Sequence, residues 1–236
     1  MANDYFQFKQ FTIHQQRCAM KVGTDGTLLG AWAQVPKNSA RILDIGTGTG
    51  LIALMMAQRF PEATVLGIDI DCEAVSQAQE NVAESPFASR VDIQLQNVLD
   101  FECEESFDAI VSNPPFFVDA LNCPDQQRTI ARHTISLTYE GLMKSAHRLL
   151  KTDGKLSLVI PSECRSLLET EASLVGFFIS RICQIRTTPR KQPKRQLIEF
   201  IKHPVNELYI EEGVIEESPN KRSSWYQHIT KDFYIK

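Results

Sequence analysis

The stretch Asp44-Ile45-Gly46-Thr47-Gly48-Thr49-Gly50 decides the fold, because it joins a short apolar run at 41–45 to a helical apolar pattern at 49–59. Glycine lets the backbone adopt positive φ, and it lets a ligand approach where a Cβ would clash. A turn of this kind lies at the carboxyl end of its strand, which is the usual ligand position in open α/β sheets. We therefore expect a strand, a ligand-binding turn and a helix here; the alternative is a tight turn without a ligand.

Strands and helices alternate on the carboxyl side of this turn. The pattern predicts strands at 64–69, 91–95, 107–112, 155–160, 178–186 and 196–201, and helices at 71–82, 139–150 and 163–175. We expect the last two strands to form a hairpin, which puts one antiparallel strand into an otherwise parallel sheet. Because strands alternate with helices, helices should cover both faces of the sheet. The predicted fold class is therefore α/β and Rossmann-like.

The chain divides into three predicted parts. We expect an N-terminal strand and helix cover at 1–35, a Rossmann-like domain at 36–204 and a C-terminal tail at 205–236. Aromatic and polar residues alternate at 5–17, which predicts a short strand or hairpin lying over the main sheet. The tail is first acidic and then basic, and its pattern indicates no chemistry.

The composition narrows the class of protein. The 236 residues include 25 Lys+Arg and 29 Asp+Glu, a net charge of −4, so a nucleic acid would have to bind at a local basic patch. The start of the chain has no signal-peptide pattern, and no run of about 18 apolar residues predicts a membrane-spanning helix. The six cysteines include no C-x-x-C pair. We therefore expect free thiols in the cytoplasm and no metal site.

Two carboxylates beside the glycine turn indicate which cofactor it binds. Asp69 ends the next strand about 20 residues after the turn, where a carboxylate accepts the hydroxyls of a ribose. Asp44 would repel a pyrophosphate but suits the ammonium group of S-adenosyl-L-methionine. A dinucleotide enzyme would also need Gly or Ala where the chain has Leu51. The sequence therefore favours S-adenosyl-L-methionine over NAD.

The expected cofactor site extends to further segments. After the third strand, Asn97 would lie near the adenine ring, with Asp100 or Phe101 as alternatives. Residues 23–27 would fold over the methionine end of the cofactor, unless Asp25 is only a helix cap. The candidate cofactor-binding residues are Gly23, Thr24, Asp44, Gly46, Gly48, Gly50, Asp69, Ile70, Asn97, Val98 and Asn113.

The corner Asn113-Pro114-Pro115-Phe116 ends the fourth strand beside the glycine turn. Two prolines fix φ and remove two backbone donors. The carbonyl groups of the Asn113 side chain and of Pro114 would accept both N–H groups of an exocyclic amine, so that its lone pair faces the methyl group. Phe116 offers a flat surface for a base that has left its helix. We expect these four residues to be catalytic in a direct SN2 transfer; the alternative is a rigid turn that ends a strand.

Together these motifs resemble those of class I S-adenosylmethionine-dependent methyltransferases that methylate amino groups. From about residue 6 to about residue 202 the chain is similar to the bacterial tRNA1(Val) (adenine-37-N6)-methyltransferase family. That similarity includes Phe6–Phe11, Met20–Gly26 and Pro193–Arg195. The resemblance implies a seven-stranded, mostly parallel sheet with an antiparallel last strand. It also implies S-adenosyl-L-methionine as cofactor, methylation of adenine N6, and a tRNA partner bound in its anticodon-loop region.

Basic residues cluster at 186–202, where Glu199 is the only opposing charge. At the rim of the sheet such a segment would clamp an RNA backbone; the alternative is a solvated loop. If four side chains neutralise phosphates, log affinity should fall with log salt at a slope of about −3. A second basic patch, which includes His133, follows the Asn-Pro-Pro-Phe corner. The candidate RNA-binding residues are Arg128, Arg132, Arg190, Lys191, Lys194 and Arg195.

Other functions share part of this pattern. Guanine-N2 rRNA methyltransferases and protein glutamine-N5 methyltransferases also have an Asn-Pro-Pro-aromatic corner. Phe116 in place of Tyr argues against the glutamine enzymes, and so does the lack of a clear extra N-terminal substrate domain. A third alternative is a non-catalytic RNA-binding protein that keeps the cofactor pocket. The leading expectation is a cytoplasmic, monomeric tRNA methyltransferase.

Overall fold

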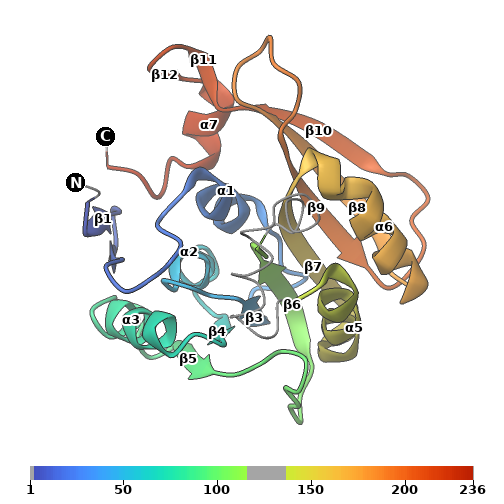
Figure 1. The fold of residues 1–236 in the computed structure, drawn as a ribbon, viewed down its shortest axis with the longest axis horizontal. Helices are drawn as coiled ribbons and strands as arrows, with labels where there is room; N and C mark the ends of the chain where they lie inside the picture. The colour runs from blue at the N-terminus through green and yellow to red at the C-terminus, as the bar shows by residue number, and fades with distance from the viewer. Residues whose placement is uncertain (1–2, 116–136, 236) are drawn as a thin grey trace, which may run out of the picture.

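The computed structural model describes residues 3–115 and 137–235. Its centre is an eight-stranded sheet in the order β10-β8-β9-β7-β6-β3-β4-β5 (Figure 1). The strands are β3 (Arg41–Ile45), β4 (Thr64–Asp69), β5 (Val91–Leu95), β6 (Phe107–Ser112), β7 (Leu150–Pro161), β8 (Phe178–Arg186), β9 (Arg195–Ile201) and β10 (Tyr209–Val214). The predicted α/β class is confirmed, although β7 begins five residues before the expected range.

The sheet is parallel except at β9, which runs antiparallel to its neighbours β7 and β8. The predicted hairpin and its antiparallel strand are therefore confirmed. Between β3 and β6 the register places Ile45 opposite Ser112, and Ser112 Oγ donates to the Ile45 carbonyl at 2.8 Å. Because parallel strands end at the same edge, the glycine turn and the Asn-Pro-Pro corner leave the sheet side by side.

The expected count of seven strands is corrected to eight, because the tail supplies β10 as a parallel partner of β8. Glu211 accepts from Arg181 at 2.6 Å, and Glu212 accepts from Arg186 at 3.0 Å. The acidic run of the tail therefore neutralises arginines of the neighbouring strand. Cross-strand pairing between residues about 30 positions apart is a long-range property, so the local pattern did not reveal it.

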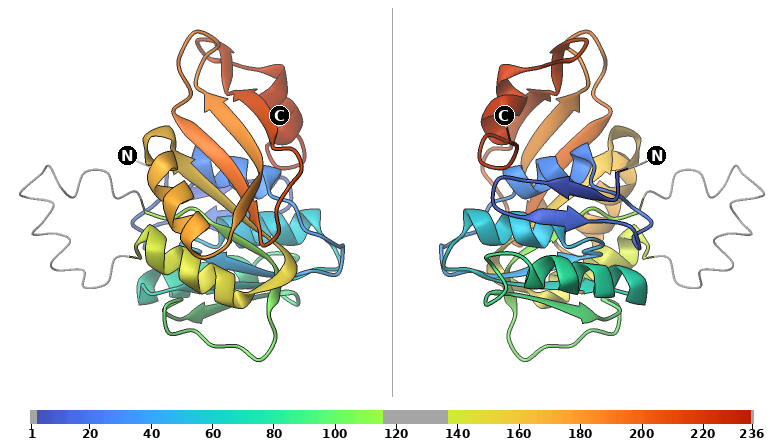
Figure 2. Two further views of the ribbon diagram at one scale, coloured as in Figure 1. Left: turned by 90° about the vertical axis from the view of Figure 1, so that its right-hand side faces the viewer. Right: turned by 90° about the vertical axis from the view of Figure 1, so that its left-hand side faces the viewer.

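Helices cover both faces of the sheet (Figures 1 and 2). One face carries α1 (Thr24–Trp32), α2 (Leu51–Arg59) and α3 (Cys72–Ala83), and the other carries α5 (Tyr139–Leu149) and α6 (Arg165–Leu174). Side chains of β3 alternate between the two cores: Ile42 packs with α1 and α2, whereas Leu43 packs with α5. Asp71 and Thr138 cap α3 and α5 by accepting backbone N–H groups.

The N-terminal hairpin consists of β1 (Tyr5–Gln7) and β2 (Thr12–His14), which pair antiparallel. It lies against α3 rather than directly on the sheet, on the side of the molecule turned to the viewer in the right panel of Figure 2. The Asn81 amide bonds the backbone of His14 twice, with Oδ1 accepting and Nδ2 donating, both at 2.9 Å. One buried side chain thus fixes the hairpin to the helix.

The two ends of the chain pack together (Figure 1). After β10 the tail forms β11 (Glu216–Ser218), β12 (Lys221–Arg222) and α7 (Ser224–Ile229). The Lys9 N–H donates to the Phe233 carbonyl at 2.8 Å, and the rings of Phe8 and Tyr234 stack with centroids 5.7 Å apart. Phe8 and Phe233 are buried in the core that α1 and α2 share with the sheet. The N-terminal cover (1–35) and the C-terminal tail (205–236) therefore both contribute side chains to the core of the Rossmann-like domain.

Candidate active site

The glycine turn forms an open cradle at the carboxyl edge of β3. Gly46, Gly48 and Gly50 have φ of 70°, 54° and 80°, in the left-handed region that only glycine adopts without strain. A Cβ added at Gly46 or Gly48 would meet no atom of residues 3–115 and 137–235 within 4 Å. The space beside these two residues is therefore open to a ligand. The turn itself is fixed, since the N–H groups of Gly46 and Thr47 donate to the Ile68 carbonyl at 2.9 and 3.0 Å.

Asp44 is buried beneath this turn. Its Oδ2 accepts from Thr47 Oγ1 at 2.7 Å and from the Ala53 N–H at 3.1 Å. Its Oδ1 is also buried but has no hydrogen-bond partner among the described residues. Burial raises the pKa of Asp44 to about 7, the charge of Asp69 adds to this, and the two hydrogen bonds oppose it. Asp44 therefore keeps one acceptor oxygen for a cationic ligand.

Asp69 lies at the end of β4, next to the turn. Its Oδ2 accepts from the Gly48 N–H at 2.9 Å and its Oδ1 accepts from the Asp71 N–H at 3.1 Å. These bonds hold the half-buried carboxylate in place and leave acceptor positions on both oxygens. Ile70 follows with an exposed side chain. Both residues are thus where the sequence predicted them, at the strand end beside the glycines.

The loop after β5 approaches the same edge, because the Gln96 N–H donates to the Asp69 carbonyl at 2.8 Å. The Asn97 side chain is used locally: Oδ1 accepts from the Leu99 N–H at 3.1 Å and Nδ2 donates to Asp100 at 3.2 Å. Val98 is buried against the α5 face of the sheet. The loop therefore lies where it would flank a ligand at this edge of the sheet, while the Asn97 side chain is hydrogen-bonded within the loop itself.

The segment before α1 lies on the other side of the turn. Gly23 is the N-cap residue of α1, Thr24 begins the helix, and a Cβ on Gly26 would lie 3.3 Å from the Leu51 side chain. This contact places the first turn of α1 against the start of α2, directly after Gly50. The alternative that Asp25 serves as the helix cap does not hold, because α1 has no side-chain cap bond.

Asn113 follows β6 directly beside Gly46. Its side chain is half-buried, and its Oδ1 is buried without a hydrogen-bond partner in the described part of the chain. Pro114 is buried and Pro115 is exposed. Two neighbouring strand ends therefore each carry a buried polar oxygen that has no partner among the described residues, one from Asp44 and one from Asn113. Phe116 lies outside the described residues.

The basic segment separates into exposed and engaged side chains. Arg190, Lys191 and Lys194 are exposed in the loop between β8 and β9, and no ion pair of theirs is found within residues 3–115 and 137–235. Arg195, by contrast, bonds Asp25 with Nε to Oδ2 at 2.8 Å. That Arg195 binds RNA stays a prediction.

Other cations that the sequence grouped with this loop are also engaged. Arg186 pairs with Glu212, and the Lys202 ammonium donates to the Leu150 carbonyl. Arg128, Arg132 and His133 lie outside the described residues. The loop between β8 and β9 thus presents three exposed cations rather than a continuous basic segment.

Two side chains that position the site were not singled out from the sequence. Thr47 holds Asp44 through its hydroxyl, and Ser112 ties β6 to β3. Cys18 also lies close to the strand ends, since its pKa is raised to about 11 by burial and then by the charges of Asp69 and Asp71. Small polar residues and a lone cysteine carry no distinctive local pattern, so only the fold reveals these neighbours.

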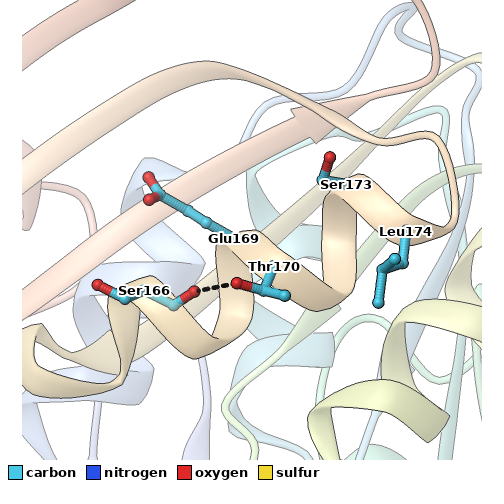
Figure 3. A pocket seen from close by; sticks show the side chains of 5 residues that line it. All are labelled: Ser166, Glu169, Thr170, Ser173 and Leu174. Carbon is cyan, nitrogen blue, oxygen red and sulfur yellow. Dashed lines mark hydrogen bonds between the residues drawn. The ribbon is translucent and has the colours of Figure 1, made fainter.

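A shallow hollow elsewhere on the surface does not coincide with this site. Its lining residues all belong to α6 (Figure 3) and are Ser166, Glu169, Thr170, Ser173 and Leu174. The charged member, Glu169, pairs with Arg165 at 2.7 Å. None of the predicted site residues that the structure describes lines the hollow, so the glycine turn remains the candidate active site.

Within the described residues, no group of three or more His, Cys, Asp or Glu side chains is arranged to hold a metal ion. No helix in that part of the chain is both long enough and apolar enough to cross a membrane.

The fold and the site define a class I S-adenosylmethionine-dependent methyltransferase. Residues 26–176 match the methyltransferase small domain family. Among solved structures, a predicted O-methyltransferase from Agrobacterium tumefaciens has a TM-score of 0.70 at 18% identity, covering 89% of this chain and 96% of its own. A TehB-like SAM-dependent methyltransferase from Corynebacterium glutamicum has a TM-score of 0.51 at 20% identity, covering 78% of this chain and 90% of its own. These likenesses establish the fold.

Relatives at higher identity define the family more closely. Proteins named tRNA1(Val) (adenine(37)-N6)-methyltransferase are 48% identical in Bacteroides thetaiotaomicron and 49% identical in Phocaeicola vulgatus, each covering 100% of this chain and 99% of the relative. A relative of that name from Histophilus somni is 40% identical over 98% of this chain and 97% of its own. The chain belongs to this methyltransferase family, as the resemblance in the sequence indicated.

Proposed function

We propose that this protein transfers a methyl group from S-adenosyl-L-methionine to N6 of adenine 37 in tRNA1(Val). The observation that carries the proposal is a pair of buried oxygens on adjacent strand ends, from Asp44 and Asn113, that have no hydrogen-bond partner within the described residues. One suits the cationic end of the cofactor and the other suits an amine N–H. The names of the full-length relatives indicate the substrate.

The residues at the glycine turn fit the cofactor. Asp44 Oδ1 would accept from the ammonium group, and Asp69 would accept from the ribose hydroxyls. The open space beside Gly46 and Gly48 would admit the part of the cofactor that faces the turn. Further contacts are proposed for residues of the flanking segments: Gly23, Thr24, Gly50, Ile70, Asn97, Val98 and Asn113. When bound, S-adenosyl-L-methionine supplies a methyl group that its sulfonium already activates for displacement.

The acceptor side is proposed to work by alignment. Asn113 Oδ1 and the Pro114 carbonyl would accept the two N–H groups of the adenine amine, so that the nitrogen lone pair points away from the protein acceptors. Acceptors placed in this way also stabilise the positive charge that grows on the nitrogen. Phe116 is proposed to stack on the extruded base. No general base is needed before attack, because the proton can leave after the nitrogen has become cationic.

We further propose the anticodon-loop region of the tRNA as the bound region, and a cytoplasmic monomer as the acting form. The exposed loop cations support an RNA contact beside the strand ends. The five described cysteines are free thiols, as expected in a reducing compartment.

Cofactor binding is expected to weaken below about pH 7, by about tenfold for each pH unit, if Asp44 must be ionised to hold the ammonium group. The stability of the free protein should follow the opposite sign. The pKa of Asp44 is about 7 in the folded protein and has its ordinary value of 3.8 in the unfolded chain. The unfolded chain therefore loses this proton at lower pH than the folded protein, and the free energy of unfolding should fall as the pH rises between these two values.

Calorimetric titration of S-adenosylhomocysteine between about pH 8 and about pH 5.5 measures the first effect. The Asp44→Asn variant should bind weakly throughout that range, with no such dependence. An affinity of the unaltered protein that stays constant from about pH 8 to about pH 6 would contradict the assigned role of Asp44.

Replacing Arg190, Lys191 and Lys194 together by alanine is expected to reduce the salt dependence of tRNA affinity. Each phosphate neutralised on a single strand contributes about 0.7 to the slope of log affinity against log salt, so the slope should become shallower by about 2. Filter binding across a salt series measures this. Lys231→Ala removes an exposed tail lysine and should leave the slope unchanged; an unchanged slope in the triple variant would remove the loop from the RNA contact.

The test of the proposed function uses labelled S-adenosyl-L-methionine and bulk tRNA from a strain that lacks the modification. After digestion to nucleosides, the label is expected in N6-methyladenosine. Label in N2-methylguanosine would show that guanine is the acceptor, and label only in protein would point to glutamine. Either result would contradict adenine as the acceptor. Tight cofactor binding without any product would favour the non-catalytic RNA-binding alternative.

A further inference from the structure

One ion pair joins the first turn of α1 to the start of β9. Arg195 Nε donates to Asp25 Oδ2 at 2.8 Å, and Arg195 Nη1 donates to the Lys194 carbonyl at 3.0 Å. The side chains are 33% and 25% exposed, so water screens the pair only partly. The two partners are 170 positions apart in the chain. Such a link fixes two distant segments to each other.

The Asp25 end belongs to the cofactor side of the site. Asp25 is in the first turn of α1, directly after Gly23 and Thr24, and it does not cap the helix. The Gly23 carbonyl accepts from the N–H and the hydroxyl of Thr27 at 3.2 and 3.0 Å. These bonds hold the residues at the start of α1 together. Gly26 packs against Leu51 at the start of α2, so the start of α1 lies beside the glycine turn.

The Arg195 end belongs to the acceptor side. Arg195 begins β9 and stands opposite Pro161, the last residue of β7. The neighbouring pair of β7 and β6 matches Leu158 with Ser112, one residue before Asn113. The end of β7 therefore lies at the same edge as the Asn-Pro-Pro corner. The ion pair thus spans the site from the cofactor side to the acceptor side.

We propose that Arg195 is a positioning residue whose ion pair with Asp25 holds the start of α1 in the conformation that closes on the cofactor. This inference rests on the proposed function. The planar guanidinium bonds a carboxylate and a backbone carbonyl at once, in a fork that an ammonium group cannot reproduce. The pair keeps the segment at residues 23–25 fixed to the strand ends that carry the acceptor groups.

The test measures binding of S-adenosylhomocysteine by calorimetry in the absence of RNA. Asp25→Asn keeps the size of the side chain and removes its charge, and it should weaken binding about tenfold. Arg195→Ala should weaken it by the same factor. The double variant should be no weaker than either single one, because both changes remove the same interaction. Arg195→Lys should fall between Arg195→Ala and the unaltered protein.

The control is Glu169→Gln, which makes the same chemical change in an Arg165–Glu169 pair of similar exposure, 30% and 35%, on α6. It should leave binding unchanged, and the melting temperatures of Asp25→Asn and Glu169→Gln should shift equally little. In steady-state assays the KM for the cofactor should rise in Asp25→Asn while kcat changes less than about twofold. The reversed pair, Asp25→Arg with Arg195→Asp, should recover part of the affinity.

Equal affinity in Asp25→Asn and the unaltered protein would overturn the inference. So would an Arg195→Ala variant that loses only tRNA affinity, because Arg195 would then be a phosphate contact. If the unaltered protein takes up no S-adenosylhomocysteine, the proposed function itself fails and the inference fails with it. Cofactor uptake by the unaltered protein therefore separates the two failures.

Discussion

Replacing Asn113 by alanine is expected to lower kcat by two to three orders of magnitude, while the affinity for S-adenosylhomocysteine changes far less. The Oδ1 of Asn113 is buried without a partner among the described residues, and it stands on the strand end next to Gly46. Losing one hydrogen bond that is stronger in the transition state costs about 3–4 kcal/mol in barrier. Single-turnover methylation of tRNA, with cofactor binding measured in parallel, checks this.

A second substitution at the same position separates chemistry from folding. Asn113→Asp keeps acceptor oxygens and should recover much of the rate that Asn113→Ala loses. If Asn113→Ala retains its kcat with unmodified tRNA, the corner is only a rigid strand end and the acceptor assignment is wrong. A matching loss of thermal stability in both variants would instead point to a structural role.

Replacing Gly48 by valine is expected to lower cofactor affinity on the order of 100-fold, since the side chain would fill space that is open beside the turn. Gly48 has φ of 54°, so the substitution also strains the backbone by about 1–3 kcal/mol. Its N–H donates to Asp69, which places the new side chain beside this predicted cofactor contact. Calorimetry with S-adenosylhomocysteine measures the loss.

Gly176→Val provides a matched control for this strain. Gly176 also has positive φ, 90°, and within the described part of the chain a Cβ there would meet only His147 Nε2, at 3.9 Å. Both variants should lose similar free energy of unfolding in urea, but only Gly48→Val should lose cofactor affinity. Equal cofactor affinity in the two variants would show that the cradle beside Gly48 is not where the cofactor binds.

The local sequence pattern predicted most of the sheet and the arrangement of its site. The glycine turn, Asp44 and Asp69 were recognisable because turn chemistry and strand periodicity depend on residues close together in the chain. The Asn-Pro-Pro corner was predicted to lie beside the turn, because parallel strands share an edge. Register then confirmed it through the pairing of Ile45 with Ser112.

The raised pKa of Asp44 is a property that the local sequence pattern does not predict. The sequence indicated a carboxylate suited to an ammonium group, but the shift to about 7 arises from complete burial beneath the turn. Burial depends on every element packed around the residue, so a local window cannot supply it. Thr47 escaped notice for the same reason, since its role is a single hydroxyl contact with Asp44.

By itself, the sequence determined the α/β class, the order of the strands along the chain and the two motifs at the carboxyl edge. Only the tertiary structure decided that the tail adds an eighth strand, and that Arg195 pairs with Asp25 rather than standing free beside the loop cations. The physical reason is range: periodicity and turn propensity act over a few residues, whereas pairing between distant segments is set when the whole sheet packs.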